Sequence, residues 1–356
     1  MIKVFVIDDS ATVRTAISDL VNRASDMYCV GSAIDPIFGW KKMQKNWPDV
    51  LVLDLEMPRK DGITFLKELM VNRPLPVLIC SSNAKEGSFK AIEALSHGAI
   101  DVFNKTEFDI KNFLDDNAHS LLDAIRNCAS TNKFFLQSEA VETRSIAKQK
   151  NDGVKLRLAK KILPGASAIC IGASTGGTQA IEKILAKLPI NLPPILVVQH
   201  MTAGFTLAFS KRLNELCALT VIEAENGMLV QNGHVYIAEG DQHMQIRMEK
   251  NQLFLVVKKG PKVSRHRPSV NVLFQSAAHV LQQNAMGILL TGMGDDGALH
   301  LKTMHDRGSF TIGQDMQSSA VYGMPKVALE LGGIDVSLPL DEIYKYIIAW
   351  AKNIES

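Results

Sequence analysis

The sequence has few cysteines, no cysteine pair of the C-x-x-C type and no long apolar run. Its five cysteines are widely spaced, which argues against a disulfide framework and against a zinc site built from cysteines. No apolar run approaches the roughly 20 residues that a membrane-spanning helix needs. The first residues also lack the basic, apolar and small-residue regions of a signal peptide. A cytoplasmic location is therefore predicted.

An excess of charge of either sign is absent as well. The chain has 39 Lys and Arg against 37 Asp and Glu, so its net charge of +2 predicts no general attraction to nucleic acid or to a membrane. With 46% hydrophobic and 21% charged residues, the composition is that of a folded protein rather than a disordered one. A length of 356 residues predicts two or three domains, each with its own core.

Residues 168–177 form the most distinctive stretch, an apolar run that ends in small residues around Ser174. The run predicts a buried strand, and Gly172 to Gly176 fits the G-x-S-x-G pattern of a strand-to-helix turn that exposes a serine nucleophile. A glycine-rich phosphate cradle or a simple tight turn would have a similar composition. The stretch lacks a Walker lysine and the G-x-G-x-x-G spacing, which weakens the nucleotide-binding interpretation.

In the N-terminal part, apolar runs alternate with helical patterns. The runs are at residues 4–7, 28–33, 50–53, 77–80 and 99–103. This alternation predicts an α/β domain with a five-stranded doubly wound parallel sheet, in which ligands bind outside the carboxyl ends of the strands. Asp8 and Asp9 follow the first strand, and Asp54 follows the third.

Three carboxylates at one sheet edge repel one another unless a cation lies between them, and oxygen ligands favour Mg²⁺. A divalent metal is therefore predicted there. Ser81, Ser82 and Lys105 stand at other strand ends, where a hydroxyl and an ammonium group could hold the oxygens of a phosphorylated aspartate. Taken singly, Asp8 or Asp9 could equally be the N-cap of the following helix.

These residues resemble the signature of response-regulator receiver domains, which have a flavodoxin-like fold. The matching pieces are Ile7 to Ser10, Asp54 to Pro58 with Asp61-Gly62, the run from Leu75 to Ser81, and Lys105. The resemblance implies that Asp54 accepts a phosphoryl group and that Ser81 and Lys105 contact it. The Mg²⁺ ligands that it implies are Asp8, Asp9, Asp54 and the backbone carbonyl of Glu56. Thr106 departs from the family, in which proline commonly follows the lysine.

Residues 129–163 are polar and mixed in charge, with a basic run at 155–161, and they predict a linker. The basic run is interpreted as a solvated tether rather than as a site for an acidic partner. The predicted domains are therefore residues 1–128 and 164–356, on either side of this linker.

The alternation of strands and helices resumes after the linker, and two further strands end in polar residues. The run at 195–199 ends at His200, and the run at 286–291 leads into a glycine-rich turn with Asp295 and Asp296. If these strands are neighbours of the strand before Ser174, then serine, imidazole and carboxylate face one crevice. An imidazole can take the proton of a serine nucleophile, and a carboxylate can orient that imidazole. Singly, the histidine could be a core or capping residue and either aspartate a helix N-cap.

The order serine, histidine, aspartate along the chain differs from that of α/β-hydrolases, so the serine motif does not indicate that superfamily. The C-terminal part instead resembles the catalytic domain of the chemotaxis protein-glutamate methylesterases. The matching stretches are residues 171–177, 198–201, 267–270, 272–274, 291–297 and 318–325. With the receiver and linker in front, the resemblance covers nearly the full chain. A second doubly wound parallel sheet, Rossmann-like in type, is expected for this domain.

The resemblance assigns roles to particular residues. It implies that Ser174 is the nucleophile, His200 the general base and Asp296 the orienting carboxylate. Backbone N–H groups near Thr175 and Met293 would form the oxyanion hole. The positions that depart from the family pattern are Thr202, Glu239, Asn271, Asp295 and Met316. None of these departures removes a catalytic group, so they bear on substrate preference more than on reaction type.

The resemblance also implies the activity: hydrolysis of glutamate γ-methyl esters on chemoreceptors, with deamidation of glutamine as a second reaction. Phosphorylation of Asp54 would activate the enzyme by uncovering a crevice that the receiver otherwise covers. The expected partners are the cytoplasmic domains of methylated chemoreceptors and a chemotaxis histidine kinase as phosphodonor, without nucleic acid or membrane insertion. The alternative is a receiver joined to a non-catalytic interaction module of a two-component pathway.

Mg²⁺ in the receiver is the one cofactor that the sequence predicts. No metal is expected in the C-terminal domain, because no H-E-x-x-H motif or cysteine pair accompanies its histidines. His234, His243 and His266 are accordingly predicted to be surface or loop residues.

Overall fold

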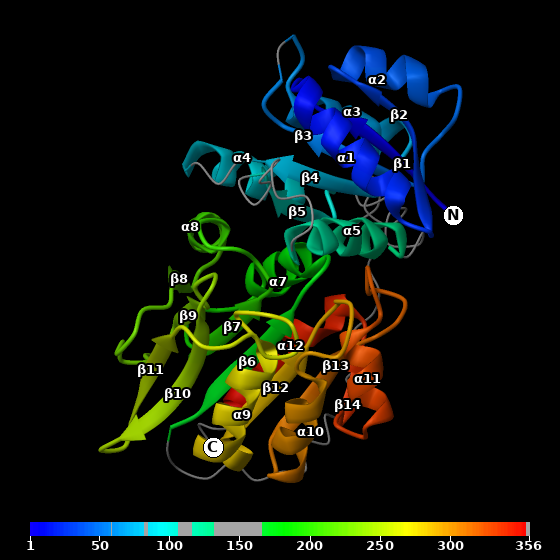
Figure 1. Ribbon diagram of the computed structural model, residues 1–356. Helices are drawn as coiled ribbons and strands as arrows, with labels where there is room; N and C mark the ends of the chain where they lie inside the picture. The colour runs from blue at the N-terminus through cyan, green and yellow to red at the C-terminus, as the bar shows by residue number, and fades with distance from the viewer. Residues whose placement is uncertain (58, 82–84, 106–115, 132–165, 354–356) are drawn as a thin grey trace, which may run out of the picture. The chain divides into compact units, whose positions relative to one another are not determined.

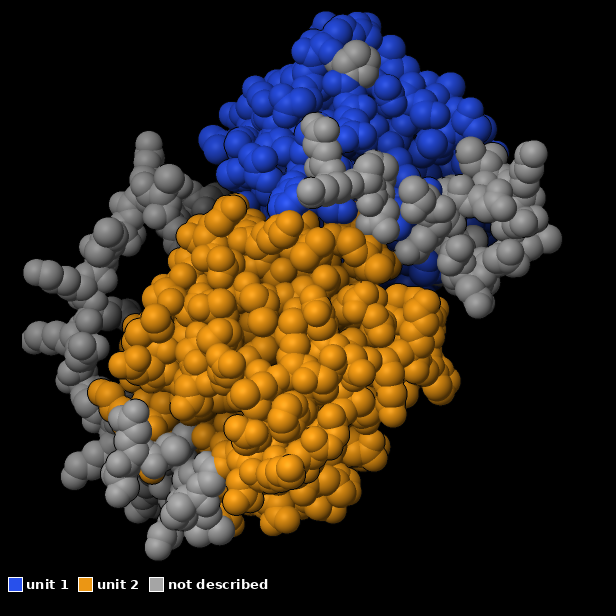
Figure 2. Space-filling model, turned by 90° about the vertical axis from the view of Figure 1, so that its left-hand side faces the viewer, with its two compact units in different colours: residues 1–146 blue, residues 147–356 orange. Residues whose placement is uncertain are grey.

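The computed structural model describes residues 1–57, 59–81, 85–105, 116–131 and 166–353. The chain divides into two compact units, residues 1–146 and 147–356 (Figure 2). Ser82, Thr106 and nearly all of the predicted linker, with its basic run, lie outside the described residues, so the predicted domain boundaries stay predictions. Within the described ranges, no helix is both long and apolar enough to cross a membrane.

The first unit contains a parallel sheet of five strands in the order β2-β1-β3-β4-β5 (Figure 1). The strands are β1 (Ile2–Ile7), β2 (Met27–Ala33), β3 (Val50–Asp54), β4 (Val77–Ser81) and β5 (Asp101–Asn104). The central strand β3 is buried along its whole length, as expected for a parallel sheet that is covered on both faces. This result confirms the predicted sheet.

The helices of this unit alternate with the strands. They are α1 (Ala11–Arg23), α2 (Pro36–Met43), α3 (Gly62–Asn72), α4 (Lys85–Ser96) and α5 (Asp116–Ala129). Three of them begin at a side-chain cap: Ser10 Oγ accepts from Val13 N, Asp35 from Phe38 N and Asp61 from Thr64 N. The first cap is Ser10, so neither Asp8 nor Asp9 is the N-cap of α1, which leaves their carboxylates for another role.

The second unit contains a seven-stranded sheet in the order β14-β13-β12-β6-β7-β9-β8, and all its strand pairs are parallel. The strands are β6 (Ala168–Ala173), β7 (Ile195–Gln199), β8 (Thr220–Glu223), β9 (His234–Ile237), β12 (Ala285–Leu289), β13 (Phe310–Gln314) and β14 (Val336–Leu338). The strand before Ser174, β6, lies between β12 and β7. The three strands that the sequence analysis singled out are therefore neighbours, and their carboxyl ends share one edge.

Two groups of helices surround this sheet. The first group consists of α7 (Gly177–Leu185), α8 (Phe205–Leu216) and α12 (Leu340–Lys352), and the second of α9 (Val270–Val280), α10 (Ala298–Asp306) and α11 (Met324–Glu330). Figure 1 shows α9 and α10 in front of the sheet and α12 behind it. The unit is therefore doubly wound, as predicted.

An antiparallel hairpin packs against α9 and is the one sheet of the described residues that the sequence analysis did not predict. It consists of β10 (His243–Glu249) and β11 (Gln252–Lys258). Its turn residues Lys250 and Asn251 both have positive φ, 46° and 64°, as a two-residue hairpin turn of type I′ requires. A short 3₁₀ helix, η2 (Gln282–Asn284), precedes β12.

Candidate active site

Ser174 lies directly after β6, where the chain turns into α7. Its backbone N–H donates to the Thr291 carbonyl at 3.0 Å. Its own carbonyl accepts from Gly177 N at 2.7 Å and from Gln199 Nε2 at 2.9 Å. The serine turn is thus tied to the ends of both neighbouring strands, β12 and β7. Ser174 is partly exposed, as a nucleophile that acts on an external substrate must be.

The glycines beside the serine make room for protein side chains. A Cβ on Gly172 would lie 2.2 Å from Val270 Cγ1. A Cβ on Gly177 would lie 2.2 Å from Gln199 Oε1. Because neighbouring side chains already fill the space next to these glycines, the turn does not have the open backbone that a phosphate cradle needs.

His200 follows β7 and lies beside the serine turn. Its backbone N–H donates to the Ala173 carbonyl at 3.1 Å, so its position relative to the end of β6 is fixed. Its side chain is 8% exposed, and Nε2 lies 2.8 Å from Asp296 Oδ2. The predicted proximity of imidazole and carboxylate is confirmed for this pair of residues.

The Asp296 carboxylate is buried and accepts four hydrogen bonds. Oδ2 accepts from His200 Nε2 and, at 2.7 Å, from Val270 N; Oδ1 accepts from Ser269 Oγ at 2.7 Å and Asn271 N at 3.1 Å. Two of these donors belong to the first turn of α9, whose positive dipole end also favours a negative charge. Burial alone would raise the pKa of Asp296, but the hydrogen bonds and the nearby His200 lower it below its usual value. The carboxylate is therefore ionised at neutral pH.

An ionised carboxylate can only accept hydrogen bonds, so the proton of a neutral His200 is on Nε2. The lone pair is then on Nδ1, which among the described residues is buried without a hydrogen-bond partner. A buried lone pair without a hydrogen bond lowers the stability of the fold, so a purely structural role does not explain it. The pair with Asp296 therefore leaves a basic nitrogen available for proton transfer.

Two backbone N–H groups near the serine are also unpaired. Neither Thr175 N nor Met293 N donates a hydrogen bond within the described part of the chain. Thr175 is 1% exposed and Met293 is 46% exposed. The Thr175 carbonyl accepts from Thr291 Oγ1 at 3.0 Å, which joins the two turns. Two neighbouring backbone N–H groups without a hydrogen-bond acceptor are the usual donors of an oxyanion hole.

The imidazole ring of His266 stacks on that of His200, and sequence reasoning missed this contact. The ring centroids are 3.7 Å apart and the planes differ by 8°. Burial and the nearby His200 lower the pKa of His266 to about 3, so its ring is neutral at physiological pH. His243 was expected at the surface or in a loop, but it is buried in β10, where Ser269 N donates to its Nδ1 at 3.2 Å. Neither the alternation nor the motifs of the sequence indicate these contacts.

Replacing His266 with alanine is expected to lower kcat for a small ester such as p-nitrophenyl acetate by about tenfold, because the His200 ring loses the surface that orients it. His266→Phe keeps a flat ring and should stay within about threefold of wild type. A phenylalanine variant as slow as the alanine variant would exclude ring stacking as the cause.

In the first unit, carboxylates gather at the ends of β1 and β3. Carboxylate oxygens of Asp8, Asp9 and Asp54 lie within 4.8 Å of one another. Asp8 and Asp54 are 1% and 3% exposed. Lys105 Nζ lies 2.7 Å from Asp8 Oδ2 and 2.8 Å from Asp54 Oδ2. The sequence prediction that these four residues come together is confirmed, and the oxygen-only cluster has the ligand chemistry of a Mg²⁺ site.

Burial raises the pKa of Asp54 above its usual value, although the charge of Lys105 opposes this shift. Burial would lower the pKa of Lys105, but Asp54 and Asp8 raise it. Lys105 therefore stays positively charged and offsets part of the repulsion between the two buried acids.

The two remaining receiver residues of the predicted site are Ser81 and Glu56. Ser81 is buried at the end of β4, and its hydroxyl donates to the Gly87 carbonyl at 3.4 Å rather than to Asp54. The backbone N–H of Glu56 donates to Asp54 Oδ1 at 3.2 Å. The Glu56 side chain lies 3.8 Å from Lys90 Nζ, whereas its backbone contacts Asp54.

Comparison with known proteins agrees with this geometry. The family model for CheB methylesterases matches residues 169–347, and that for response regulator receiver domains matches residues 4–115. Protein-glutamate methylesterase/protein-glutamine glutaminase 2 of Hahella chejuensis is 43% identical over 98% of this chain and 95% of its own length. Protein-glutamate methylesterase/protein-glutamine glutaminase 3 of Shewanella oneidensis is 44% identical over 99% of this chain and its full length.

A solved structure matches the second unit. The crystal structure of the Thermotoga maritima CheB methylesterase catalytic domain is 36% identical, with a TM-score of 0.51, and the match covers 52% of this chain and 98% of that chain. The receiver model, the methylesterase model and the nearly full-length relatives follow one another along the same chain. The chain therefore belongs to the family of CheB methylesterases that carry an N-terminal response regulator receiver domain.

Proposed function

We propose that the protein is a phosphorylation-activated hydrolase that demethylates glutamate γ-methyl esters on chemoreceptors and also deamidates glutamine. The observation that carries the proposal is the convergence of Ser174, His200 and Asp296 at the ends of three adjacent strands, with His200 Nε2 2.8 Å from Asp296. The names of the full-length relatives supply both activities.

In the first half of the reaction, Ser174 Oγ attacks the carbonyl carbon of the γ-methyl ester. His200 Nδ1, the nitrogen that is not bonded to Asp296, takes the hydroxyl proton. The oxyanion of the tetrahedral intermediate accepts hydrogen bonds from Thr175 N and Met293 N. Its collapse breaks the bond to the methoxy oxygen, which receives the proton from His200 and leaves as methanol.

In the second half, water attacks the acyl-enzyme and gives its proton to His200. Collapse of this intermediate returns the proton to Ser174 Oγ and releases the glutamate carboxylate. With glutamine the first leaving group is ammonia instead of methanol, and the remaining steps are the same. Throughout, the Asp296 carboxylate stabilises the imidazolium form of His200.

Control of the reaction is assigned to the first unit. Asp54 would receive the phosphoryl group from a chemotaxis histidine kinase, with Mg²⁺ held by Asp8, Asp9, Asp54 and the backbone carbonyl of Glu56. The ion, when bound, neutralises charge on the phosphoryl oxygens. Lys105, which already contacts Asp54, would pair with one of these oxygens. The new contacts stabilise an arrangement of the chain in which substrate reaches Ser174.

The experiment that tests the function is methanol release from a methylated chemoreceptor cytoplasmic domain by the full-length protein with acetyl phosphate and Mg²⁺. We expect methanol release in proportion to enzyme. A protein that hydrolyses p-nitrophenyl acetate but releases no methanol from the receptor would be an esterase with a different substrate. A protein inactive on both would support the non-catalytic interaction module.

Replacing Asp54 with asparagine is expected to abolish activation. Acetyl phosphate should raise the methanol release of the wild type by about tenfold, within the usual range of coupling between two sites. The Asp54→Asn variant should show no increase, because an amide cannot accept the phosphoryl group. Asp19→Asn, at an exposed position of α1, is the matched control and should be activated like the wild type. Equal activation of both variants would contradict the proposed phosphorylation site.

A further inference from the structure

The segment that joins β11 to α9 has an unusual local charge. Residues 258–267 contain five cationic side chains and no acidic one. The cations are Lys258, Lys259, Lys262, Arg265 and Arg267. The chain as a whole is nearly balanced, with 39 basic and 37 acidic residues, so this cluster is a local feature. We call residues 258–267 the basic segment.

The basic segment lies beside the candidate catalytic residues. His266, next to Arg265 in the chain, stacks on the His200 ring at 3.7 Å. A Cβ built on Gly294 would lie 3.5 Å from Arg265 Nη2, so the guanidinium group adjoins the turn that contains Met293. Arg265 Nη2 also lies 3.9 Å from Asp295 Oδ1. Arg265 is thus placed where it can contact a polypeptide whose side chain reaches Ser174.

A tight turn holds Arg265 at this place. Val263 N donates to the His266 carbonyl at 3.0 Å, and His266 N donates back to the Val263 carbonyl at 2.9 Å. The two residues between them, Ser264 and Arg265, have φ of 49° and 70°, which is unfavourable for residues other than glycine. Asn271 Nδ2 donates to Ser264 Oγ at 3.0 Å and supports the turn. The side chain of Arg265 is nevertheless 80% exposed, so the turn fixes its backbone and leaves its charge in solvent.

Only part of the charge of the basic segment is compensated by the protein itself. Arg267 forms an ion pair with Asp241, and Lys259 Nζ lies 3.7 Å from the same carboxylate. Arg265 faces Asp295, which is 63% exposed. Five cations against these two carboxylates leave three positive charges uncompensated. Lys258 and Lys262 are exposed and make no ion pair with the described residues.

We propose that the basic segment selects substrates in which acidic residues flank the reacting glutamyl side chain, and that Arg265 is the principal residue of this selection. The inference rests on the proposed function and adds the class of polypeptide that the site accepts. A guanidinium group binds carboxylates in a bidentate manner, and Lys262 adds to the local positive potential. Asp295, whose carboxylate faces Arg265, would compete with the substrate for the guanidinium group.

The test uses the full-length protein and three fluorescent peptides that differ only beside a central γ-methyl glutamate, where they carry glutamate, glutamine or lysine. Fluorescence anisotropy gives Kd, and methanol release gives kcat and KM. We expect the acidic peptide to bind about tenfold more tightly than the glutamine peptide at low salt, with the lysine peptide weakest. The difference should appear in KM rather than in kcat, and should shrink at 0.5 M salt, where the screening length is only about 4 Å.

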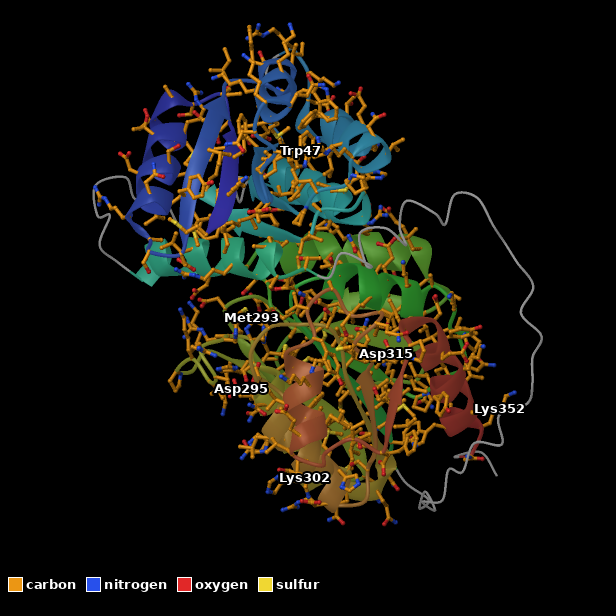
Figure 3. All side chains as sticks on the ribbon, turned by 90° about the vertical axis from the view of Figure 1, so that its right-hand side faces the viewer. Trp47, Met293, Asp295, Lys302, Asp315 and Lys352 are labelled. Carbon is orange, nitrogen blue, oxygen red and sulfur yellow. The ribbon has the colours of Figure 1, made fainter. Side chains whose placement is uncertain are left out.

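Variants assign the effect to the arginine. Arg265→Asn, which tolerates the positive φ, should weaken binding of the acidic peptide about three- to fivefold and leave the glutamine peptide unchanged. Arg265→Lys keeps the charge and should restore most of the preference. Lys352→Ala, at an exposed lysine on the last turn of α12 and away from Met293 and Asp295 (Figure 3), is the control and should bind all three peptides as the wild type does.

The outcomes separate this inference from the proposed function. Equal affinity for the three peptides, or a preference that is as large in Arg265→Asn as in the wild type, would overturn the inference even if methanol is released from each peptide. A preference that falls about three- to fivefold in Arg265→Asn would support the inference even if no peptide releases methanol, in which case the proposed function is wrong. Tighter binding of a single-stranded oligodeoxynucleotide of the same charge would overturn the assignment to acidic polypeptides.

Discussion

Methanol release is expected to fall by a factor of about 10⁴ to 10⁶ when Ser174 is replaced by alanine. In the proposed mechanism, the variant loses the oxygen that would form the acyl-enzyme and keeps only the binding site and the proposed oxyanion donors, which would give a small residual rate. The measurement is the initial rate of methanol release from the methylated receptor domain by the full-length protein with acetyl phosphate and Mg²⁺.

The same variant should fold like the wild type. The turn is packed so closely that a Cβ on Gly292 would lie 2.7 Å from the Ser174 Cβ, and alanine retains this Cβ while adding no atom. The thermal unfolding midpoint should therefore be unchanged. Ser210→Ala is a matched control, because the Ser210 hydroxyl donates only to the Leu207 carbonyl within α8, and it should keep full activity. Equal rates for Ser174→Ala and the wild type would exclude the serine mechanism.

The strands and their order at the site follow from the sequence to a large extent. Apolar runs that stop at Ser174, His200 and the turn before Asp296 are what a parallel sheet with one functional edge requires. The adjacency of β12, β6 and β7 was a condition of the sequence argument, and the structure fulfils it. Of the two acids in the turn, Asp296 is 1% exposed and contacts His200, whereas Asp295 faces solvent and Arg265.

The side-chain details could not be predicted, because they depend on contacts between loops that are distant in the sequence. His266 lies 66 positions after His200, and no periodic pattern links the two rings that stack in the structure. The role of α9 in holding Asp296 is hidden for the same reason, since a helix N-terminus does not specify which distant carboxylate caps it. For the hairpin there was a signal: residues 253–257 form a continuous apolar run between polar residues, a pattern that a short buried strand can have.

Asp296→Asn is the second variant with a large expected effect, a loss of about 10⁴ in kcat for both the receptor domain and p-nitrophenyl acetate. An asparagine oxygen that faces Ser269 Oγ and Asn271 N would place the amide NH₂ group toward Val270 N and His200 Nε2. That NH₂ group can only donate, so His200 must turn its Nε2 lone pair toward it and move its proton to Nδ1. Because Nδ1 then carries a proton, it cannot accept one from Ser174. The value of kcat therefore falls although the variant keeps the same fold.

Asp295→Asn makes the same chemical change one residue earlier, at a carboxylate that is 63% exposed and does not contact His200. Its kcat for p-nitrophenyl acetate should stay within about threefold of the wild type, since an exposed charge interacts only weakly with the ion pair of His200 and Asp296. Comparable losses in the two variants would mean that the general charge of the turn, and not the contact with His200, is what the reaction needs.

Stability gives an independent test of the Asp296 carboxylate, because its pKa is lower in the folded protein than the value near 4 of an unfolded chain. A group with a lowered pKa stabilises the fold fully above its unfolded value, and this contribution disappears as the pH falls through the folded pKa. In Asp296→Asn, Val270 N loses its acceptor, which should cost about 1–3 kcal/mol of unfolding free energy at pH 7. The difference from the wild type, measured by urea unfolding, should therefore narrow below about pH 4, where this carboxyl group begins to bind a proton in the unfolded wild-type chain but not yet in the folded one. A difference that does not change between pH 7 and pH 3 would mean that the variant is destabilised by its shape and not by the loss of charge.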